Sequence, residues 1–424
     1  MKESIKKRIE AVRRGEVPEG YRIENGYLIP NDWKTVPLNR RFTRSTRKNK
    51  SGCENVLTIS AQMGLVNQRE FYDKDIASED KSGYLLMKNG EFAYNKSYST
   101  GYPYGVIKQL TKYDEGIVSP LYICFAPNAG TNTAFYTQYF EGGRYNREIY
   151  RVAQEGARNH GLLNVSVEDF FEGTLVEPSA YEQQKIAEIL ATCDRVIELK
   201  QRKIDELNKL KQVCLLEMFP KEGQAVPEIR FKGFTAPWEQ RKLGELALFN
   251  PKDELPQTFE YVDLESVVGT EMLSHRTEVK SSAPSRAQRL AHTGDLFYQT
   301  VRPYQKNNYL FEKPDNNYVF STGYAQMRPY VDGYFLLSLV QSERFVKVVL
   351  DNCTGTSYPA INANDLAEIE VAAPSDESEA QKIGTIFRSI DNLITLHQRE
   401  LAEIGKYKKA LMQLLLTGLV RVNA

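Results

Sequence analysis

The chain has 424 residues, with 55 basic and 55 acidic side chains and hence a net charge of zero. This length exceeds what one hydrophobic core supports, so the chain is expected to form several modules of a globular protein. Its five cysteines show no CxxC spacing and it has four histidines, which argues against a zinc site and against a disulfide framework. No apolar run of 18 residues and no signal peptide occur, so we expect a cytoplasmic protein without a membrane span.

Basic charge gathers at the start of the chain. Residues 1–50 hold 14 Lys and Arg against six Asp and Glu. Such a cluster can hold phosphates while the remaining surface stays balanced. An ordinary solvated basic face explains it equally well. The run at the end of this segment consists of Arg40, Arg41, Arg44, Arg47, Lys48 and Lys50.

The first 178 residues predict a mixed domain. Residues 4–14 are typical of a short basic helix, and Asn25-Gly26 between two β-prone runs predicts a hairpin. Short strands and turns follow to about residue 175, with one helical stretch at 145–153. We assign residues 1–178 to the basic helix and this first domain.

Residues 179–219 predict one long helix. The stretch has no Pro or Gly after Pro178, and its apolar residues alternate in steps of three and four, the 3.5-residue period of a left-handed coiled coil. Lys200 and Lys211 interrupt this apolar seam. The seam residues are Ile186, Leu190, Cys193, Ile197, Ile204, Leu207, Cys214 and Met218.

The same pattern returns 197 residues later, in residues 376–424. Thirteen of the 37 residues from 182 to 218 are identical to their partners at this shift, which indicates an internal duplication. His397 and Lys408 take the places of Lys200 and Lys211. The second seam consists of Ile383, Phe387, Ile390, Ile394, Leu401, Ile404, Leu411 and Leu415.

The domain between the helices, residues 220–375 with its linker, repeats the first domain in outline. Trp238 matches Trp33, and the segment 294–298 (GDLFY) matches 90–94 (GEFAY). A helical stretch, 342–352, precedes the loop 354–358. We therefore predict an α+β fold: two mixed domains related by pseudo-two-fold symmetry and joined by two long antiparallel coiled-coil helices. Two reading heads for two DNA half-sites and a spacer carrying two protein-binding domains are equally compatible with this geometry.

These residues carry a family resemblance. The chain resembles the DNA-specificity subunit of type I restriction–modification systems, through the EQQKI opening of the central helix at 182–186 and the segment 155–171 (EGARNHGLLNVSVEDFF). The entry segments at Trp33 and Trp238 and the loop 354–361 support it. The resemblance covers the whole chain in the family's order. The second helix opens Glu379-Ala380-Gln381-Lys382 and lacks one glutamine of the usual run.

The resemblance implies a subunit that reads DNA without catalysing a reaction. Each mixed domain would be a target-recognition domain for one half of an interrupted double-stranded DNA sequence. The paired helices would set the spacing and dock two modification (methyltransferase) subunits. By this resemblance, S-adenosylmethionine and ATP with Mg²⁺ belong to partner subunits, the modification subunits and the restriction subunits (translocase and nuclease), and this chain needs no cofactor.

The motifs agree with a non-catalytic role. The sequence contains no GxxxxGK[ST] phosphate loop and no NPPY-like adenine-methylation motif. Asn250-Pro251-Lys252 lacks the aromatic residue of the latter. A fragment of a fused restriction–methylation polypeptide would need catalytic motifs from elsewhere. A coiled-coil adaptor with two protein-binding domains remains the alternative from another class.

Specific readout of DNA needs Arg, Lys, Asn or Gln at base edges, with further contacts to phosphates. Polar, aromatic-rich loops follow the matched strands GEFAY and GDLFY in both domains, and each is an ordinary surface turn if it does not contact DNA. In the first domain the candidates are Arg40, Arg41, Arg44, Arg47, Lys48, Lys96, Tyr98, Tyr102, Tyr104, Lys108 and Arg158. In the second they are Arg302, Tyr304, Gln305, Lys306, Asn307, Asn308, Tyr309 and Tyr358.

Overall fold

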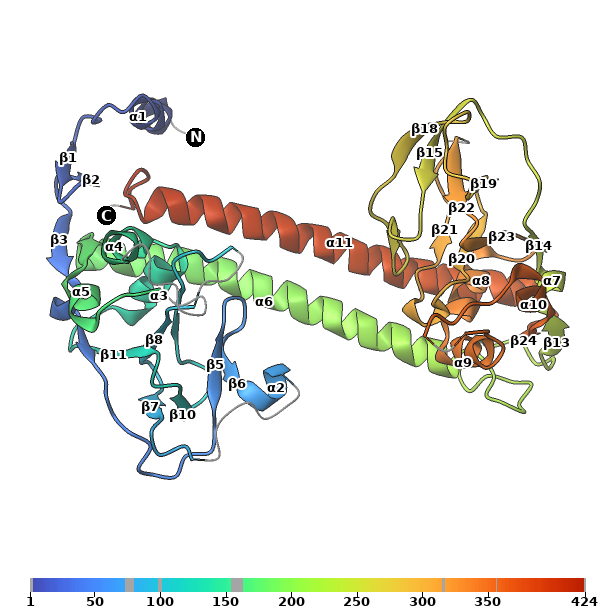
Figure 1. Ribbon diagram of the computed structural model, residues 1–424, viewed down its shortest axis with the longest axis horizontal. Helices are drawn as coiled ribbons and strands as arrows, with labels where there is room; N and C mark the ends of the chain where they lie inside the picture. The colour runs from blue at the N-terminus through green and yellow to red at the C-terminus, as the bar shows by residue number, and fades with distance from the viewer. Residues whose placement is uncertain are drawn as a thin grey trace. The chain divides into compact units, whose positions relative to one another are not determined.

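The structure, a computed structural model, describes residues 3–72, 80–97, 101–153, 163–314, 317–355 and 357–422. The chain forms two compact units: unit 1 comprises residues 1–199 and 401–424, and unit 2 comprises residues 200–400. Each unit contains a mixed domain and a section of both long helices, α6 (Ala180–Glu217) and α11 (Glu377–Leu415) (Figure 1). Both long helices lie where the sequence predicted them.

Unit 1 is built on a four-stranded antiparallel sheet in the order β4-β11-β8-β9. The predicted hairpin at Asn25-Gly26 is confirmed, with β1 paired to β2 and both turn residues at positive φ. The elements before α6 are α1 (Glu3–Arg13), β1 (Tyr21–Glu24), β2 (Tyr27–Pro30), β3 (Lys34–Pro37), η1 (Leu38–Arg40), β4 (Phe42–Arg44), β5 (Leu57–Ser60), β6 (Gly64–Asn67), α2 (Gln68–Tyr72), β7 (Leu85–Lys88), β8 (Phe92–Asn95), β9 (Val106–Gln109), β10 (Glu115–Val118), β11 (Ile123–Pro127), α3 (Thr133–Glu141), α4 (Asn146–Val152), α5 (Val167–Glu172) and β12 (Thr174–Glu177).

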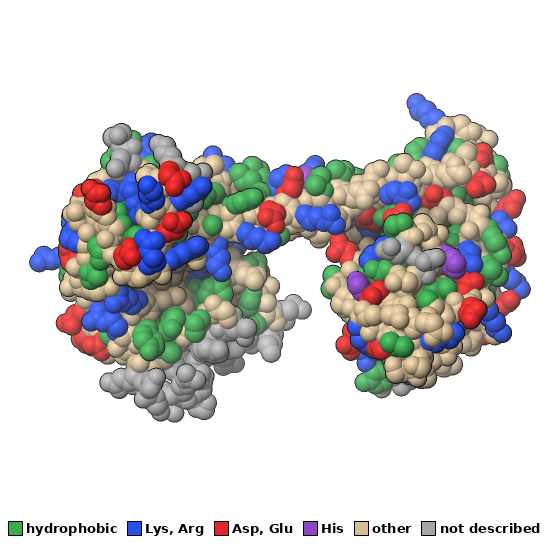
Figure 2. All heavy atoms as spheres, turned by 90° about the horizontal axis from the view of Figure 1, so that it is seen from above, with side chains coloured by type: hydrophobic (Ala, Val, Ile, Leu, Met, Phe, Trp, Pro, Cys, Tyr) green, Lys and Arg blue, Asp and Glu red, His purple; other side chains and the backbone are tan. Residues whose placement is uncertain are grey.

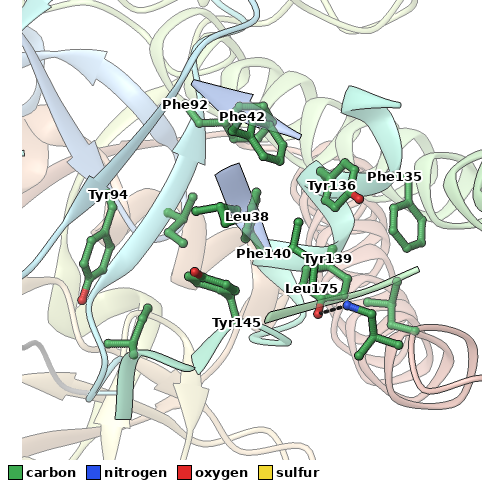
Figure 3. Close-up of a cluster of buried hydrophobic side chains, with 14 of the residues drawn as sticks. Leu38, Phe42, Phe92, Tyr94, Phe135, Tyr136, Tyr139, Phe140, Tyr145 and Leu175 are labelled. Atoms are coloured by element: carbon green, nitrogen blue, oxygen red, sulfur yellow. Dashed lines mark hydrogen bonds between the residues drawn. The ribbon is translucent and has the colours of Figure 1, made fainter. Parts of the chain in front are cut away.

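Aromatic side chains fill the core of unit 1. Phe42 and Phe92 from the sheet meet Tyr136 and Phe140 from α3, and Phe42 contacts all three at ring-centroid distances of 5.1 to 5.8 Å (Figure 3). The same cluster includes Ile186 and Leu190 from the start of α6 and Leu415 from the end of α11. The first turns of α6 and the last turns of α11 are therefore part of the hydrophobic core of unit 1.

Unit 2 repeats this plan with a second four-stranded sheet in the order β14-β23-β20-β21. Strand β20 takes the place of β8, and β13 pairs with β24 as β3 pairs with β12. Its elements between α6 and α11 are β13 (Glu239–Lys242), α7 (Leu243–Leu246), β14 (Ala247–Phe249), β15 (Thr258–Val262), β16 (Val267–Val268), β17 (Glu271–Met272), β18 (Arg276–Val279), β19 (Ala287–Leu290), β20 (Leu296–Gln299), η2 (Pro303–Gln305), β21 (Tyr309–Leu310), β22 (Tyr318–Ser321), β23 (Tyr324–Pro329), α8 (Gly333–Gln341), α9 (Glu343–Asp351), α10 (Ala363–Glu368) and β24 (Glu370–Ala373).

The two domains differ outside this shared sheet. Unit 2 carries a further four-stranded sheet, β18-β15-β22-β19, which includes the parallel pair β15–β22. In its place unit 1 has the two-stranded pairs β5–β6 and β7–β10. The two copies therefore share the four-stranded sheet and differ in their additional strands.

The long helices pair antiparallel within each unit. In unit 2, Lys200 bonds Glu400 at 2.7 Å and Lys211 bonds Asp391 at 2.6 Å, so the partner's number falls as the residue number rises. In unit 1, Lys408 pairs with Asp194. A shift of 197 residues converts the Lys211–Asp391 pair into the Lys408–Asp194 pair, as a two-fold relation between the helix copies requires. The predicted α+β fold class with antiparallel long helices is confirmed.

Burial along the seam follows this pairing. The seam residues near the domains are almost fully buried, for example Leu190 and Phe387 at 0% exposure. Cys193 and Ile197 in unit 1, like Leu401 and Ile404, are half-buried. Two helices alone cannot cover their shared stripe as completely as a domain core does. The buried seam residues are Ile186, Leu190, Ile204, Leu207, Met218, Ile383, Phe387, Ile390, Ile394 and Leu415.

Several short helices differ from the sequence prediction. We expected one helical stretch in the first domain, 145–153, and the structure has α4 there, but α3 precedes it and α5 follows it. In the second domain α9 matches the predicted stretch 342–352, whereas α8 was missed. Both missed helices α3 and α8 are buried on most sides, so their apolar residues do not show a one-sided helical period.

Candidate nucleic-acid interface

The two loops proposed to read DNA occupy equivalent places in the two units. The first follows β8 and leads into β9, and the second follows β20 and leads into β21. Each strand begins after a glycine at positive φ, Gly90 at 87° and Gly294 at 96°. An acidic residue with a buried carboxylate comes next in both: Glu91 pairs with Arg47 and Asp295 with Arg328. The turn that enters these strands is thus a shared feature of both units.

In unit 2, much of the predicted loop is engaged inside the domain. Asn308 is 1% exposed, and its Oδ1 accepts a hydrogen bond from the backbone N–H of Gln299 at 2.9 Å. The Gln299 amide in turn donates to Oε1 of Gln305 at 2.9 Å. Lys306 bonds Glu343 at 2.6 Å, and Oδ1 of Asn307 accepts from the N–H of Gly269 at 2.8 Å. These side chains fix the conformation of the loop.

Three other predicted residues of unit 2 lie differently. Tyr309 packs against the aromatic cluster of the second sheet, and burial raises its pKa. Tyr304 and Tyr358 project outward, with 48% and 63% of their surface exposed. The Arg302 guanidinium lies over the Tyr358 ring, 4.4 Å from its centroid. The structure therefore brings together Arg302 and Tyr358, which are 56 positions apart in the sequence.

In unit 1, the loop after β8 carries Lys96 at its start, and Tyr98 and Arg158 lie outside the described residues. Tyr102 is half-buried, and burial, followed by the charge of Glu141, raises its pKa. The backbone carbonyl of Tyr104 accepts from the hydroxyl of Tyr94 at 2.9 Å. Lys108 pairs with Glu141.

Some residues of the basic run of unit 1 are paired within the domain, and others are exposed without a partner among the described residues. Arg41 donates from Nε and Nη2 to the fully buried Glu177 at 2.6 and 2.7 Å, and this hydrogen bonding raises the pKa of Arg41. Arg47 pairs with Glu91 at 3.1 Å, and Lys48 donates to the carbonyl of Gly83 at 2.8 Å. Arg40 and Arg44 are exposed, and their side chains have no partner among the residues that the structure describes.

Basic and acidic side chains are interspersed over the visible face of each unit, and Figure 2 shows this mixture. A balanced surface matches the zero net charge. Unpaired basic side chains are candidates for sequence-specific contacts. Arg40, Arg44 and Arg302 are such side chains.

Sequence reasoning missed the contacts that tie each domain to its long helix. Glu182 at the start of α6 is 2% exposed and accepts from Nε1 of Trp33 at 2.8 Å and from Arg421 at 2.9 Å. Glu379 at the start of α11 is 1% exposed and accepts from Arg230 at 2.7 and 2.8 Å. The signal was present, since Glu182 and Glu379 are identical in the duplication, but their arginine partners do not match at that shift.

The interruptions of the seam are held by charged contacts between the helices. Lys200 lies 3.4 Å from Nδ1 of His397 and 2.7 Å from Glu400.

The Gln-Lys pairs at the starts of the long helices make different contacts. Lys185, at the start of α6, bonds Glu188 on its own helix, whereas Lys382 lies over the ring of Phe234. Gln184 also donates to Glu188, at 3.1 Å. Gln381 donates to Glu377, and Oε1 of Gln184 accepts from Nδ2 of Asn132 in the domain at 3.3 Å.

Two further features are absent from the described part of the chain. No helix there combines the length and apolarity needed to cross a membrane. Within the same residues, no group of three or more His, Cys, Asp or Glu side chains is arranged to hold a metal ion.

Comparison with known proteins points to one family. Residues 236–406 match the model of the type I restriction modification DNA specificity domain. The type I restriction enzyme MjaVIII specificity subunit of Methanocaldococcus jannaschii is 26% identical over 62% of this chain and 66% of its own length. The putative MjaX specificity subunit of the same organism is 23% identical over 93% of this chain and 95% of its length.

Solved structures agree on the fold. The type I restriction–modification S subunit from M. genitalium has a TM-score of 0.56 at 14% identity, covering 93% of this chain and 97% of that one. A chain from a structure on complex assembly and conformational transition of the type I R-M system has a TM-score of 0.52 at 16% identity, covering 93% and 100%. The resemblance to type I specificity subunits is confirmed, and residues 236–406 match the DNA specificity domain.

Proposed function

We propose that this chain is the specificity subunit that gives a type I restriction–modification complex its DNA sequence preference. The domain of unit 1 reads one half of an interrupted double-stranded target, and the domain of unit 2 reads the other half. The paired helices connect the two domains and fix the length of the unread spacer. The match of residues 236–406 to the DNA specificity domain supports this proposal.

One observation carries the proposal for two half-sites. The same sheet occurs in both units, and the loops after β8 and β20 occupy equivalent places in it but differ in sequence. Two copies of one scaffold with different loops are suited to two different short sequences. An adaptor with two protein-binding domains does not account for the match to the DNA specificity domain.

The proposal assigns the chemistry to partner subunits. Two modification subunits, with S-adenosylmethionine, dock on the paired helices and methylate one adenine in each half-site. Restriction subunits, with ATP and Mg²⁺, join them for cleavage. This chain acts without catalysing a reaction. Gln184, Lys185, Gln381 and Lys382 are candidates for contacts with the modification subunits because the duplication kept them while the domains diverged.

Mapping of adenine methylation across the host genome tests the proposal. A strain that expresses the chain should show a methylated motif of two short sequences separated by a fixed number of unread bases. Deletion of the chain should remove this motif, and re-expression should restore it. Unchanged methylation after deletion would contradict the proposal and favour the adaptor.

A further inference from the structure

Arg302 differs from the other stacked arginines of this protein. Six arginine side chains lie over aromatic rings in the described residues. Five of them also donate to an oxygen of the protein: Arg8, Arg147, Arg276, Arg388 and Arg421. No such acceptor is recorded for the guanidinium of Arg302 within the described part of the chain. Its hydrogen-bonding edge is thus available to a ligand.

The backbone holds Arg302 and Tyr358 together. The N–H of Arg302 donates to the carbonyl of Pro359 at 2.8 Å, and the N–H of Ile361 donates to the carbonyl of Thr300 at 3.0 Å. Val301 also forms an antiparallel bridge with Ala360. The two segments are therefore aligned as short strands, and the stacked pair is preorganised rather than formed by two free side chains.

Hydrogen bonds within the domain hold the turn that contains Arg302 in one conformation. Arg302 has a left-handed backbone conformation, with φ 54° and ψ 57°, and Lys306 has φ 55°. Residues other than glycine adopt this conformation at an energetic cost, and such residues often occur at functional sites. The buried Asn308 and the Gln299–Gln305 hydrogen bond offset this cost by fixing the turn. Arg302 is partly exposed, and its guanidinium lies over the exposed ring of Tyr358.

We propose that Arg302, oriented by Tyr358, reads a guanine in the half-site of unit 2, an inference that rests on the proposed function. A guanidinium offers two parallel N–H donors that match O6 and N7 of guanine in the major groove, and this is the commonest specific contact of arginine with DNA. Stacking on Tyr358 restricts the guanidinium plane, so less conformational entropy is lost when both hydrogen bonds form. The neighbouring loop residues Gln305, Lys306 and Asn308 serve as the support of Arg302.

A modified duplex tests this without changing the protein. The full chain, in complex with its modification subunits, is titrated with duplexes that carry the mapped target, each with one guanine replaced by 7-deazaguanine, which lacks the N7 acceptor. One replacement in one half-site should weaken binding by about 10- to 100-fold. The Arg302→Ala complex should bind wild-type and modified duplexes alike at that position. If replacement of no single guanine in either half-site gives this pattern, the proposal is overturned.

Charge-conserving variants separate base reading from phosphate binding. Arg302→Lys keeps the charge but loses the planar guanidinium that lies over Tyr358, so in the methylation map it should relax the motif at that one position, more weakly than Arg302→Ala does. Tyr358→Ala should do so more weakly, and Tyr358→Phe, which keeps the ring, should retain the wild-type motif. A phosphate contact would instead leave the motif unchanged in both Arg302→Lys and Arg302→Ala, and this result overturns the proposal.

The two proposals fail in different ways. If deletion of the chain leaves adenine methylation unchanged, the proposed function fails and the assignment of Arg302 fails with it. If deletion removes a two-part motif but both Arg302 variants write the wild-type motif, only the assignment of Arg302 fails. Continued reading of the remaining positions of the unit 2 half-site by the Arg302 variants shows that unit 2 is folded.

Discussion

Equivalent core positions are occupied by hydrogen-bonded polar residues in unit 1 and by apolar residues in unit 2. In unit 1, the last residue of β12 is Glu177, which is fully buried and accepts hydrogen bonds from Arg41 and from the hydroxyl of Tyr136. In unit 2, strand β24 ends at the equivalent position in Ala373, which pairs with Glu239 of β13 as Glu177 pairs with Lys34 of β3. The residues equivalent to Arg41 and Tyr136 are Leu246 and Leu336, both 0% exposed.

This difference shows that the buried ionic cluster is not needed for the fold. A whole set of polar residues in one copy corresponds to a whole set of apolar residues in the other. Buried ion pairs are often replaceable by apolar residues as a set, because the cost of removing the charges from water offsets their attraction. Removal of one member alone leaves an uncompensated buried group, so the two kinds of change should have opposite consequences.

Glu177→Ala should therefore have the largest effect on stability among the changes considered. It leaves the partly buried Arg41 without its carboxylate and the hydroxyl of Tyr136 without its acceptor. We expect the free energy of unfolding of unit 1 to fall by about 4 kcal/mol. Each unit contains one tryptophan, Trp33 or Trp238. Urea unfolding followed by Trp33 fluorescence in a Trp238→Phe background measures unit 1.

The matched control converts the cluster to the unit 2 type. The triple change Arg41→Leu, Tyr136→Phe and Glu177→Ala removes the charges together and should recover most of the stability lost in Glu177→Ala. A triple variant less stable than the single variant would show that the cluster itself stabilises unit 1.

The contacts at the start of the long helices should give the next largest effect. Arg230 supplies both side-chain donors recorded for Glu379, whereas Glu182 also accepts from Trp33 and from the N–H of Val422 at 3.1 Å. Arg230→Ala should lower the stability of unit 2 by about 3 kcal/mol. Arg421→Ala should cost unit 1 about 1 to 2 kcal/mol because two neutral donors remain.

Each of these losses is measured with the tryptophan of its own unit. Trp238 fluorescence in a Trp33→Phe background reports on Arg230→Ala, and Trp33 fluorescence in a Trp238→Phe background reports on Arg421→Ala. Equal losses would mean that the donors from Trp33 and Val422 contribute nothing to the solvation of Glu182.

The long helices could be predicted from sequence because their information is local and repeated. A seam with a 3.5-residue period, found twice at one shift, defines the elements and their antiparallel pairing. The helices α3 and α8 lack a one-sided pattern, since five of the nine residues of α3 and seven of the nine of α8 are buried. Their caps, Asn132 and Asp332, were the available signals, as each accepts from the N–H three residues on.

The candidate site could be predicted as a set of loops but not residue by residue. Arg41 and Arg44 look alike in the sequence, yet Arg41 binds a carboxylate 136 positions away and Arg44 is exposed. Whether a basic side chain is free depends on such distant partners. The stacking of Arg302 on Tyr358 depends in the same way on the bridge between residues 301 and 360.

The equivalent ion pairs of the helices should contribute small and similar amounts. Lys211→Ala breaks the bond to Asp391 in unit 2, and Lys408→Ala breaks the bond to Asp194 in unit 1. Because all four side chains retain some contact with solvent, each change should cost about 1 kcal/mol or less. Single-tryptophan unfolding of the two units measures both. A large difference between them would contradict the equivalence that the 197-residue shift predicts.

The smallest effect should come from a contact between the long helices that the duplication does not reproduce. Glu400 accepts from Lys200 and lies 2.9 Å from His397, whereas the equivalent position of the other copy is occupied by Lys203.

Hydrogen bonds from Lys200 and then His397 lower the pKa of Glu400 below its ordinary value of 4.5. A carboxylate whose pKa is lowered by folding contributes stability above the ordinary pKa and loses it as the pH falls below that value. The stability difference between the wild type and Glu400→Gln should therefore shrink as the pH falls below 4.5. A difference that persists unchanged to pH 3 would show that the amide alters the packing of the helices rather than the charge pairing with Lys200.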